Sequence, residues 1–490
     1  MNLEKNINPI QKNQNENNKS VISVLVNCFL WLLFIGNISY LVLNFFSIPE
    51  WMLGNILKIN GFTILIWTTV TFFSAIVSSY AKSYLTGFKY QSKFMILCLS
   101  FTLSVMLLVM SNNIFLLLFS WLIMGVFMAH LIGIDATWGE AREAKKFTQK
   151  YFLIGTFFLA IGLLLLAFSS DKFTVSGLSA AVSTLPNQIT LIAAFCIIAA
   201  AIVQSAIYPF HRWLLSAMTS PTPASALMHA GFVNGAGILL ALFSTLLFAS
   251  NTLTILFAIG GFTAIIAQFT KLLQVNVKQK LACSTIAQMG FMIMQCGLGF
   301  FNAAVAHLIL HGFYKAYLFL SSGEEILQTK PEKDKPIKIK PFQALVVLAF
   351  GGLGAYLFAI WTGKGTQLDS SIFLTLVVAI TVGQATYNIV KEKSLSVVQK
   401  IVVPAVIFVA GIGVYALMYN GVTILMLDMP MIDQPMPLSW VQIIFGFTFL
   451  IGFFIMKLRV YKKIPWLYVK LLNISQPNKK SVLMYKTKSI

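Results

Sequence analysis

The sequence predicts an all-α, polytopic membrane protein: a membrane helix bundle of about 14 transmembrane helices. Hydrophobic residues make up 58% of the 490 positions and charged residues only 10%, whereas roughly a quarter of the residues of a soluble domain are charged. The apolar residues gather in continuous stretches of about 20 residues, the length of helix that crosses ~30 Å of hydrocarbon. Because these stretches do not alternate apolar and polar positions, they indicate helices rather than barrel strands.

Fourteen such spans follow one another along the chain. Residues 94–134 are counted as two spans because Ser111, Asn112 and Asn113 interrupt the apolar block. The expected spans are 21–46, 59–81, 94–111, 112–134, 150–169, 188–208, 221–249, 252–270, 276–298, 300–321, 341–361, 370–390, 401–419 and 440–458.

Polar segments divide these spans into a large and a small group. Residues 1–20 are rich in Asn, Gln and Lys and are expected to form a disordered cytoplasmic tail. Interleaved Lys and Pro residues mark a cytoplasmic linker at 323–340, which separates a membrane domain at 21–322 from C-terminal membrane helices at 341–458. A cytoplasmic tail follows at 459–490, with an interfacial composition of Tyr, Trp and Lys. No soluble domain is predicted.

The net charge of +20 reports topology rather than nucleic-acid binding. With the N-terminus inside, 31 of the 35 Lys and Arg residues fall in inside segments. The outside loops hold only Lys58, Lys172 and Lys364, and Lys315 lies within a span. This asymmetry is the positive-inside signature, and it predicts that both termini are cytoplasmic.

Several functional classes lack their motifs. The chain has no phosphate-binding loop, no dinucleotide fingerprint and no H-E-x-x-H zinc motif, so ATP-driven transport and dinucleotide chemistry are not supported. Its five cysteines show no C-x-x-C spacing and are expected to be small buried residues. The long first span, which no cleavage site follows, does not resemble a signal peptide.

The most specific polar pattern is His307, His311 and Lys315 in the span 300–321. Steps of four residues place all three on one helix face, along roughly 12 Å of the axis at 1.5 Å per residue. A lysine at mid-bilayer costs roughly 2.5–3.5 kcal/mol, and histidine exchanges protons near neutral pH. The pattern indicates a proton or cation relay. The alternative is that Lys315 extends to the cytoplasmic surface while the histidines bond neighbouring helices.

A second feature is Pro209, which interrupts the apolar run 205–213. Proline removes a backbone donor and clashes with the preceding turn, and carbonyls freed in lipid need internal partners or water. Broken helices of this kind often line transport sites. A simple helix end at a cytoplasmic loop is the alternative.

A proline-led helix start at 221–229 follows and carries a buried histidine, His229. Gly231, Gly235 and Gly237 come next. For these glycines, close helix packing is the favoured role.

These residues carry a resemblance to a known family. Ser205–Gly237, with PFHRW and PTPASALMHAG, and 275–323, with VNVKQKLACSTIAQMGFM and HLILHGFYKAYLFLSSG, closely resemble the proton-conducting membrane transporter family. That family includes the antiporter-like subunits of respiratory complex I and of multi-subunit sodium/proton antiporters, and the similarity covers roughly 60–320. STIAQMGFM followed by QCGLG at 295–299 looks most like the DabB, or MpsA, type, the membrane subunit of a two-component inorganic-carbon transporter.

The resemblance implies an antiporter-like fold with broken helices in a bacterial cell membrane. It also implies a partner, a large DabA-type zinc protein with a carbonic-anhydrase-like site. The pair is expected to accumulate bicarbonate or CO2 with a cation gradient. This chain would then be a transporter subunit without enzyme activity or a cofactor of its own, and the zinc would lie on the partner.

The family's functional positions carry over in part. By position, the ion pathway is implied to contain Lys278, His307, His311, Lys315, His229, Gln204 and His130. Gln204 stands where the family has a lysine, and Leu122 follows Trp121 where the family has a glutamate. The N-terminal half therefore lacks the Glu/Lys pair thought to gate protons, although Gln204 and water can still relay them.

Three functions remain open. The first is a cation-coupled inorganic-carbon transporter subunit. The second is an ion-translocating subunit of a sodium/proton antiporter or an NADH dehydrogenase-like respiratory complex. The third is a membrane anchor for a soluble enzyme. The missing Glu/Lys pair favours the first or third, because an antiporter subunit needs the full set of charges.

Overall fold

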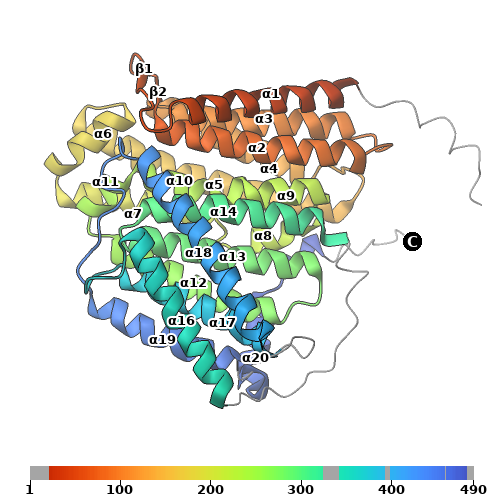
Figure 1. The fold of residues 1–490 in the computed structure, drawn as a ribbon. Coiled ribbons are helices and arrows are strands. Elements are labelled where there is room, and N and C mark those ends of the chain that lie inside the picture. The colour runs from red at the N-terminus through yellow and green to blue at the C-terminus, as the bar shows by residue number, and fades with distance from the viewer. Residues whose placement is uncertain (1–20, 324–340, 392–397, 458–459, 483–490) are drawn as a thin grey trace, which may run out of the picture.

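The computed structural model describes residues 21–323, 341–391, 398–457 and 460–482, and within them nearly all regular structure is helical (Figure 1). The sheet among the described residues is a hairpin of β1 (Trp51–Leu53) and β2 (Leu57–Ile59), with Trp51 opposite Ile59. The predicted all-α, polytopic class is confirmed.

The long helices correspond to the predicted spans. They are α1 (Val21–Leu43), α2 (Gly61–Tyr84), α3 (Gln91–Met110), α4 (Ile114–Ile132), α5 (Gly139–Ser170), α7 (Asn187–Gln204), α12 (Leu253–Leu272), α13 (Val277–Gly297), α14 (Phe301–Leu320), α16 (Pro341–Thr362), α17 (Ile372–Lys391), α18 (Gln399–Leu425) and α19 (Trp440–Lys457). Short helices join them: α6 (Val175–Ala181), η2 (Val182–Thr184), α8 (Arg212–Ser216), η3 (Ala217–Thr219), α9 (Thr222–Ala230), η4 (Phe232–Asn234), α10 (Gly235–Leu242), α11 (Ser244–Ala249), η5 (Val460–Lys463), α20 (Pro465–Ile474) and η6 (Lys479–Ser481).

Within the described residues, ten helices are long and apolar enough to cross a membrane, with Thr222–Leu242 counted as one of them. The other four predicted spans fall on α13, α16, α17 and α19. The number fourteen therefore stays a prediction. So do the domain boundaries, since residues 1–20 and most of the linker 323–340 lie outside the described residues.

Asparagine side chains start several of these helices. Asn60 accepts a hydrogen bond from the Thr63 amide at the start of α2, and Asn113 caps α4 by accepting from the Phe115 amide. Such caps satisfy amide groups that a helix leaves free at its first turn. The predicted interruption of the 94–134 block is confirmed, because α3 ends at Met110 and α4 begins at Ile114.

The helix interruptions agree with the expected pattern at Pro209 and differ from it within 221–249. Helix α7 ends at Gln204, and Pro209 lies in the non-helical segment that leads to α8. The predicted span 221–249 is not one helix but the series α9, η4, α10 and α11, with the first break at Gly231. Broken helical structure is present, and its break within a span falls at Gly231.

Helix α14 lies between the two groups of helices. It packs against α9, α13 and α18, and in Figure 1 α9 lies above it and α13 below it. One large apolar core joins α1–α14, and a second core joins Phe257 and Phe300 to Phe358 and Phe373 of the C-terminal helices. The predicted relay residues therefore sit on a helix that has protein on several sides.

Candidate functional site

The histidines and lysine of α14 share one face, as their four-residue spacing predicts. The rings of His307 and His311 stack with centroids 6.1 Å apart and an interplanar angle of 18°. His311 is 5% exposed and Lys315 is 0% exposed. Phe291 of α13 covers His307 at a centroid distance of 5.2 Å. The stripe therefore faces the protein interior.

Lys315 points to a neighbouring helix and does not reach the surface. Its Nζ donates a hydrogen bond of 3.1 Å to the carbonyl oxygen of Leu281 in α13. The ion pairs found among the described residues do not include Lys315. The alternative in which Lys315 extends to the cytoplasmic surface is wrong, because the ammonium is fully buried against a backbone carbonyl.

One carbonyl connects Lys315 to His229. The Leu281 oxygen also accepts a hydrogen bond of 3.1 Å from the Thr285 hydroxyl, and Thr285 Oγ1 lies 2.9 Å from His229 Nδ1. A hydroxyl has a single hydrogen to donate. Because Thr285 donates it to Leu281, the His229 Nδ1 group must be the donor in the second bond. His229 Nε2 then carries the free lone pair.

Several imidazole nitrogens of this cluster are buried without a hydrogen-bond partner among the described residues. They are His229 Nε2, His307 Nε2, and both Nδ1 and Nε2 of His311. Most buried polar atoms in proteins are paired, so a group of unpaired ones requires an explanation. Imidazole nitrogens aligned beside a buried ammonium are suited to accept and pass on protons.

Lys278 and Gln204 contact the broken segment that carries His229. The Lys278 Nζ donates a 2.7 Å hydrogen bond to the Ser220 carbonyl, just before α9. The Gln204 amide donates a 3.2 Å bond to the Phe232 carbonyl in η4, just after the Gly231 break. The two predicted pathway residues therefore bind backbone carbonyls at the two ends of α9, Lys278 before its start and Gln204 after the Gly231 break.

His130 stands apart from this cluster among the described contacts. Its Nδ1 lies 2.8 Å from the Val126 carbonyl of its own helix, α4.

His211, beside the α7–α8 break, binds the Ile474 carbonyl of α20 through Nε2 at 2.7 Å. Burial lowers the pKa of His211 to about 4, and its hydrogen bond to Ile474 opposes this shift only in part. His211 is therefore neutral and holds α20 in place.

Sequence reasoning missed the residues that position His229. Thr285 fixes one ring nitrogen, and Phe319 stacks on the ring at 4.3 Å. A signal for Thr285 was present, since it lies seven residues after Lys278 and therefore on the same face of α13. In the described part of the chain, no group of three His, Cys, Asp or Glu side chains comes together as a metal site.

The fold and this site define a polytopic membrane protein whose helix bundle encloses a row of histidine and lysine side chains. A family model described as NADH:quinone oxidoreductase/Mrp antiporter, TM, matches residues 111–342. The chain belongs to this NADH:quinone oxidoreductase/Mrp antiporter family.

The relatives include carbon transporter subunits and respiratory subunits. The probable inorganic carbon transporter subunit DabB2 of Halothiobacillus neapolitanus is 32% identical over 370 residues, 74% of this chain and 66% of that protein. The probable DabB subunit of Bacillus subtilis is 34% identical over 51% of this chain and 50% of its own length. NADH-ubiquinone oxidoreductase chain 5 of Dictyostelium citrinum is 32% identical over 65% of this chain and 51% of its own length. The chain spans about half to two thirds of the length of such relatives.

Solved structures share the fold. A chain of the Mrp complex from Dietzia superposes with a TM-score of 0.63 and 18% identity, covering 92% of this chain and 54% of that one. A chain of the archaeal membrane-bound sulfane sulfur reductase superposes with a TM-score of 0.57 and 19% identity, covering 94% of both chains. At these identities the likeness concerns the fold, which is antiporter-like.

Proposed function

We propose that this chain is the membrane subunit of a two-component, cation-gradient-coupled inorganic carbon transporter and provides its proton or sodium pathway. Similarity to several proteins described as probable inorganic carbon transporter subunits supports this function. The partner in this proposal is a large DabA-type zinc protein, on which any carbonic-anhydrase-like chemistry takes place. The chain itself is not an enzyme, and it lies in a bacterial cell membrane with both termini cytoplasmic.

The observation that carries the proposal is the buried track on α14. Lys315 holds a positive charge on the Leu281 carbonyl without an ion-pair partner among the described residues. Such a charge is costly in a membrane and is retained where it serves transport. His311 stacks on His307 at 6.1 Å and shares the face of α14 with Lys315. A proton that leaves the ammonium therefore finds imidazole acceptors on both sides.

Labelled bicarbonate uptake tests the function. A carbonic-anhydrase-deficient bacterial host would express this chain with and without the DabA-type partner. We expect accumulation, and growth at atmospheric CO2, only when both chains are present. Absence of uptake together with restored sodium resistance would instead support an antiporter subunit.

Replacing Lys315 tests the track itself. The Lys315→Ala variant is expected to lower uptake at least about tenfold without lowering the amount of protein in the membrane, because only the mobile charge is removed. Western blotting of membranes provides the abundance control. Uptake equal to that of the wild type would show that the track does not serve transport and would support a membrane anchor instead.

The second candidate is an ion-translocating subunit of a sodium/proton antiporter or an NADH dehydrogenase-like complex. Similarity to NADH-ubiquinone oxidoreductase chain 5 proteins favours it. The neutral residues Leu122 and Gln204 argue against it, because the resemblance places the gating Glu/Lys pair there.

Adding the missing cation tests whether position 204 belongs to the ion pathway. Gln204 is 2% exposed and bonds the broken segment, so Gln204→Lys would place an ammonium next to the helix break. We expect a measurable change in proton flux in everted vesicles, with Gln204→Met as the uncharged control. If both variants conduct like the wild type, position 204 does not belong to the pathway.

A further inference from the structure

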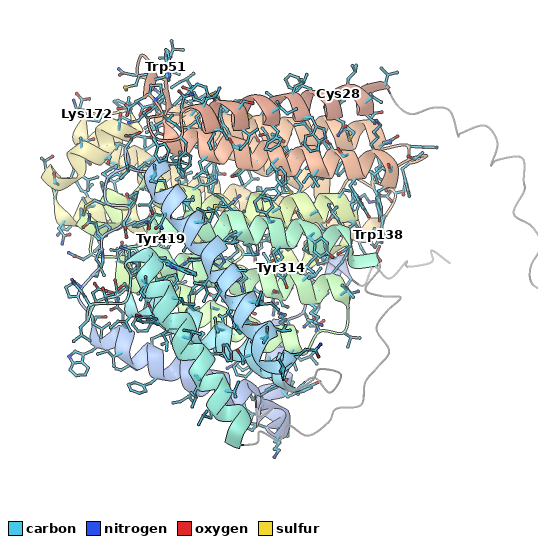
Figure 2. All side chains as sticks on the ribbon, viewed as in Figure 1. Cys28, Trp51, Trp138, Lys172, Tyr314 and Tyr419 are labelled. Carbon is cyan, nitrogen blue, oxygen red and sulfur yellow. The ribbon has the colours of Figure 1, made fainter. Side chains whose placement is uncertain are left out.

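We propose that the ion pair of Lys364 and Asp433 gates the end of the α14 track opposite to Lys315, and that polar side chains on α18 and α13 connect this gate to His307. The inference rests on the proposed function, because it assigns the second mouth of the same ion pathway. We call this end of the bundle, which carries β1 and β2, the hairpin end. In Figure 2, Tyr419 lies toward the hairpin end, whereas Tyr314 lies farther from it.

The ion pair is partly buried. Lys364 Nζ lies 2.7 Å from Asp433 Oδ1, with side chains 14% and 25% exposed. The other ion pair at this end, between Lys58 and Glu50, is 26% and 38% exposed. The Lys364 ammonium also lies 5.1 Å from the centre of the Phe300 ring, next to the start of α14. The pair therefore lies between the surface and the first turn of the track helix.

Backbone hydrogen bonds fix the loop that carries Asp433 to the start of α14. The Phe301 amide donates to the Ile432 carbonyl at 2.9 Å, and the Gln434 amide donates to the Gly299 carbonyl at 3.1 Å. Gly299 has a φ of 89°, and a side chain there would collide with the Gln434 carbonyl. Asp433 is thus held from both sides above α14.

Tyr419 of α18 contacts Asp433 on the side of the protein interior. Its hydroxyl lies 3.4 Å from Asp433 Oδ1 and donates to the carboxylate. The Tyr419 hydroxyl oxygen also accepts a hydrogen bond of 3.2 Å from the Asn302 amide. The same amide donates to Thr423 Oγ1 at 2.8 Å. Asn302 is 0% exposed and Tyr419 is 2% exposed. The polar contact therefore leads from the ion pair into the protein interior.

Tyr415 lies one helical turn before Tyr419 in α18 and provides a second phenol. Positions 415 and 419 are four residues apart and share a helix face. Tyr415 lines a cavity together with Gln295 of α13, whose amide nitrogen and oxygen have no hydrogen-bond partner among the described residues. Gln295 is 0% exposed. The polar line thus passes from α18 to α13, the helix that also bonds Lys315.

This cavity lies next to the α14 track. It has a volume of about 320 Å³ and is lined by Gln295, Thr381 and Tyr415 together with apolar side chains that include Phe291. Phe291 is the ring that packs against His307. Water bound to the Gln295 amide, which is unpaired within the described part of the chain, would connect it to the Tyr415 hydroxyl in this cavity.

This geometry allows proton passage with every group restored. A proton that binds the Asp433 carboxylate neutralises it and weakens its hold on the Lys364 ammonium. The protonated carboxyl then donates its proton to the Tyr419 oxygen, and Tyr419 releases its own hydroxyl proton to a water molecule on the side of Tyr415, which leaves the phenol neutral and the carboxylate charged again. A sodium ion would compete with the Lys364 ammonium for the same carboxylate.

The test is cation flux through the complete chain with its partner in vesicles that contain a pH-sensitive or sodium-sensitive dye. We expect Asp433→Asn and Tyr419→Phe to lower the flux at least about tenfold. The matched control Lys58→Gln removes the other ion pair at the same end and is expected to conduct within about twofold of the wild type. Melting temperatures of the purified variants establish that each one folds.

Tyr415→Phe keeps the test decisive if Tyr419→Phe fails to fold, because its hydroxyl does not bond the loop of Asp433 in the described structure. Wild-type flux in Asp433→Asn and in either tyrosine variant would overturn the gate. This outcome is separate from failure of the proposed function, in which the wild type would conduct cations but accumulate no labelled bicarbonate. A wild-type chain that moves no cation would overturn both.

Discussion

At the scale of single residues, the site depends on one carbonyl group shared by two functional side chains. Leu281 accepts hydrogen bonds from both Lys315 and Thr285, and Thr285 in turn orients His229. The ammonium and the imidazole are therefore coupled through a group that does not titrate. When Lys315 leaves the carbonyl, Thr285 still holds its own bond, so His229 keeps its Nε2 lone pair directed away from Thr285.

The Thr285→Val variant tests this orientation. Valine preserves the branched shape but removes the acceptor of His229, so the ring can turn and exchange its tautomer. We expect ion flux to fall about tenfold, while Thr285→Ser, which retains the hydroxyl, conducts nearly as well as the wild type. Flux assays in vesicles, normalised to the amount of chain, provide the measurement. Equal flux in the valine and serine variants would show that the hydroxyl does not orient the ring for transport.

How much of the site the sequence predicted depends on how local each signal was. The stripe on α14 was predictable because a spacing of four residues reports a helix face directly. The contact of Lys364 with Asp433 was not predictable, because the two residues are 69 positions apart in the sequence. A lysine in a loop indicates only the orientation of the chain in the membrane. The role of Leu281 was not predictable either, because Lys315 binds its backbone oxygen and not its side chain.

At the scale of helices, close approach of α12 and α13 positions the Leu281 carbonyl. A side-chain carbon at Gly290 would lie 2.7 Å from the Ala264 amide nitrogen and 2.7 Å from the Gly260 carbonyl. A carbon at Gly260 would lie 2.5 Å from the Gly290 carbonyl. Small residues at such a contact let helix backbones approach closely in membranes. The position of α13, and with it the acceptor of Lys315, depends on these glycines.

Gly290→Ala is expected to push α13 away from α12. Inserting a methyl group into so tight a contact typically destabilises by about 1–3 kcal/mol, and the shift should also lower uptake. Gly36→Ala in α1 is the matched control, because nothing lies within 4 Å of the added carbon and alanine favours a helix. Thermal unfolding in detergent and uptake in cells measure the two effects. A Gly290→Ala protein as stable and active as Gly36→Ala would contradict this role of the contact.

Helix boundaries were predictable where side chains define them. Asn113 marks the start of α4 because its side chain caps the first turn. The division of 221–249 was not foreseen, because the segment is apolar throughout and hydropathy does not distinguish η4 from an α-helix. Tertiary contacts define this break: Gln204 bonds the Phe232 carbonyl, and Asn234 bonds the Leu308 carbonyl of α14 at 3.3 Å.

At the scale of the whole molecule, the two ends of the bundle differ in their polar groups. One end carries the short connection between α12 and α13, close to Lys278 and Lys271. The hairpin end carries β1, β2 and α6 (Figure 1). The track between them runs along α14, from the gate beside Phe300 to Lys315. The direction of ion movement therefore depends on which end faces the cytoplasm.

Labelling of introduced cysteines tests the orientation. The positive-inside asymmetry places Lys172 outside and Val275 inside, and both side chains are exposed, Val275 to 99%. In a variant without its five native cysteines, Lys172→Cys should react with a membrane-impermeant maleimide on intact cells. Val275→Cys should react only after permeabilisation. The reverse pattern would place Lys315 at the external end, so that an inward gradient would load the lysine before the ion pair of Asp433.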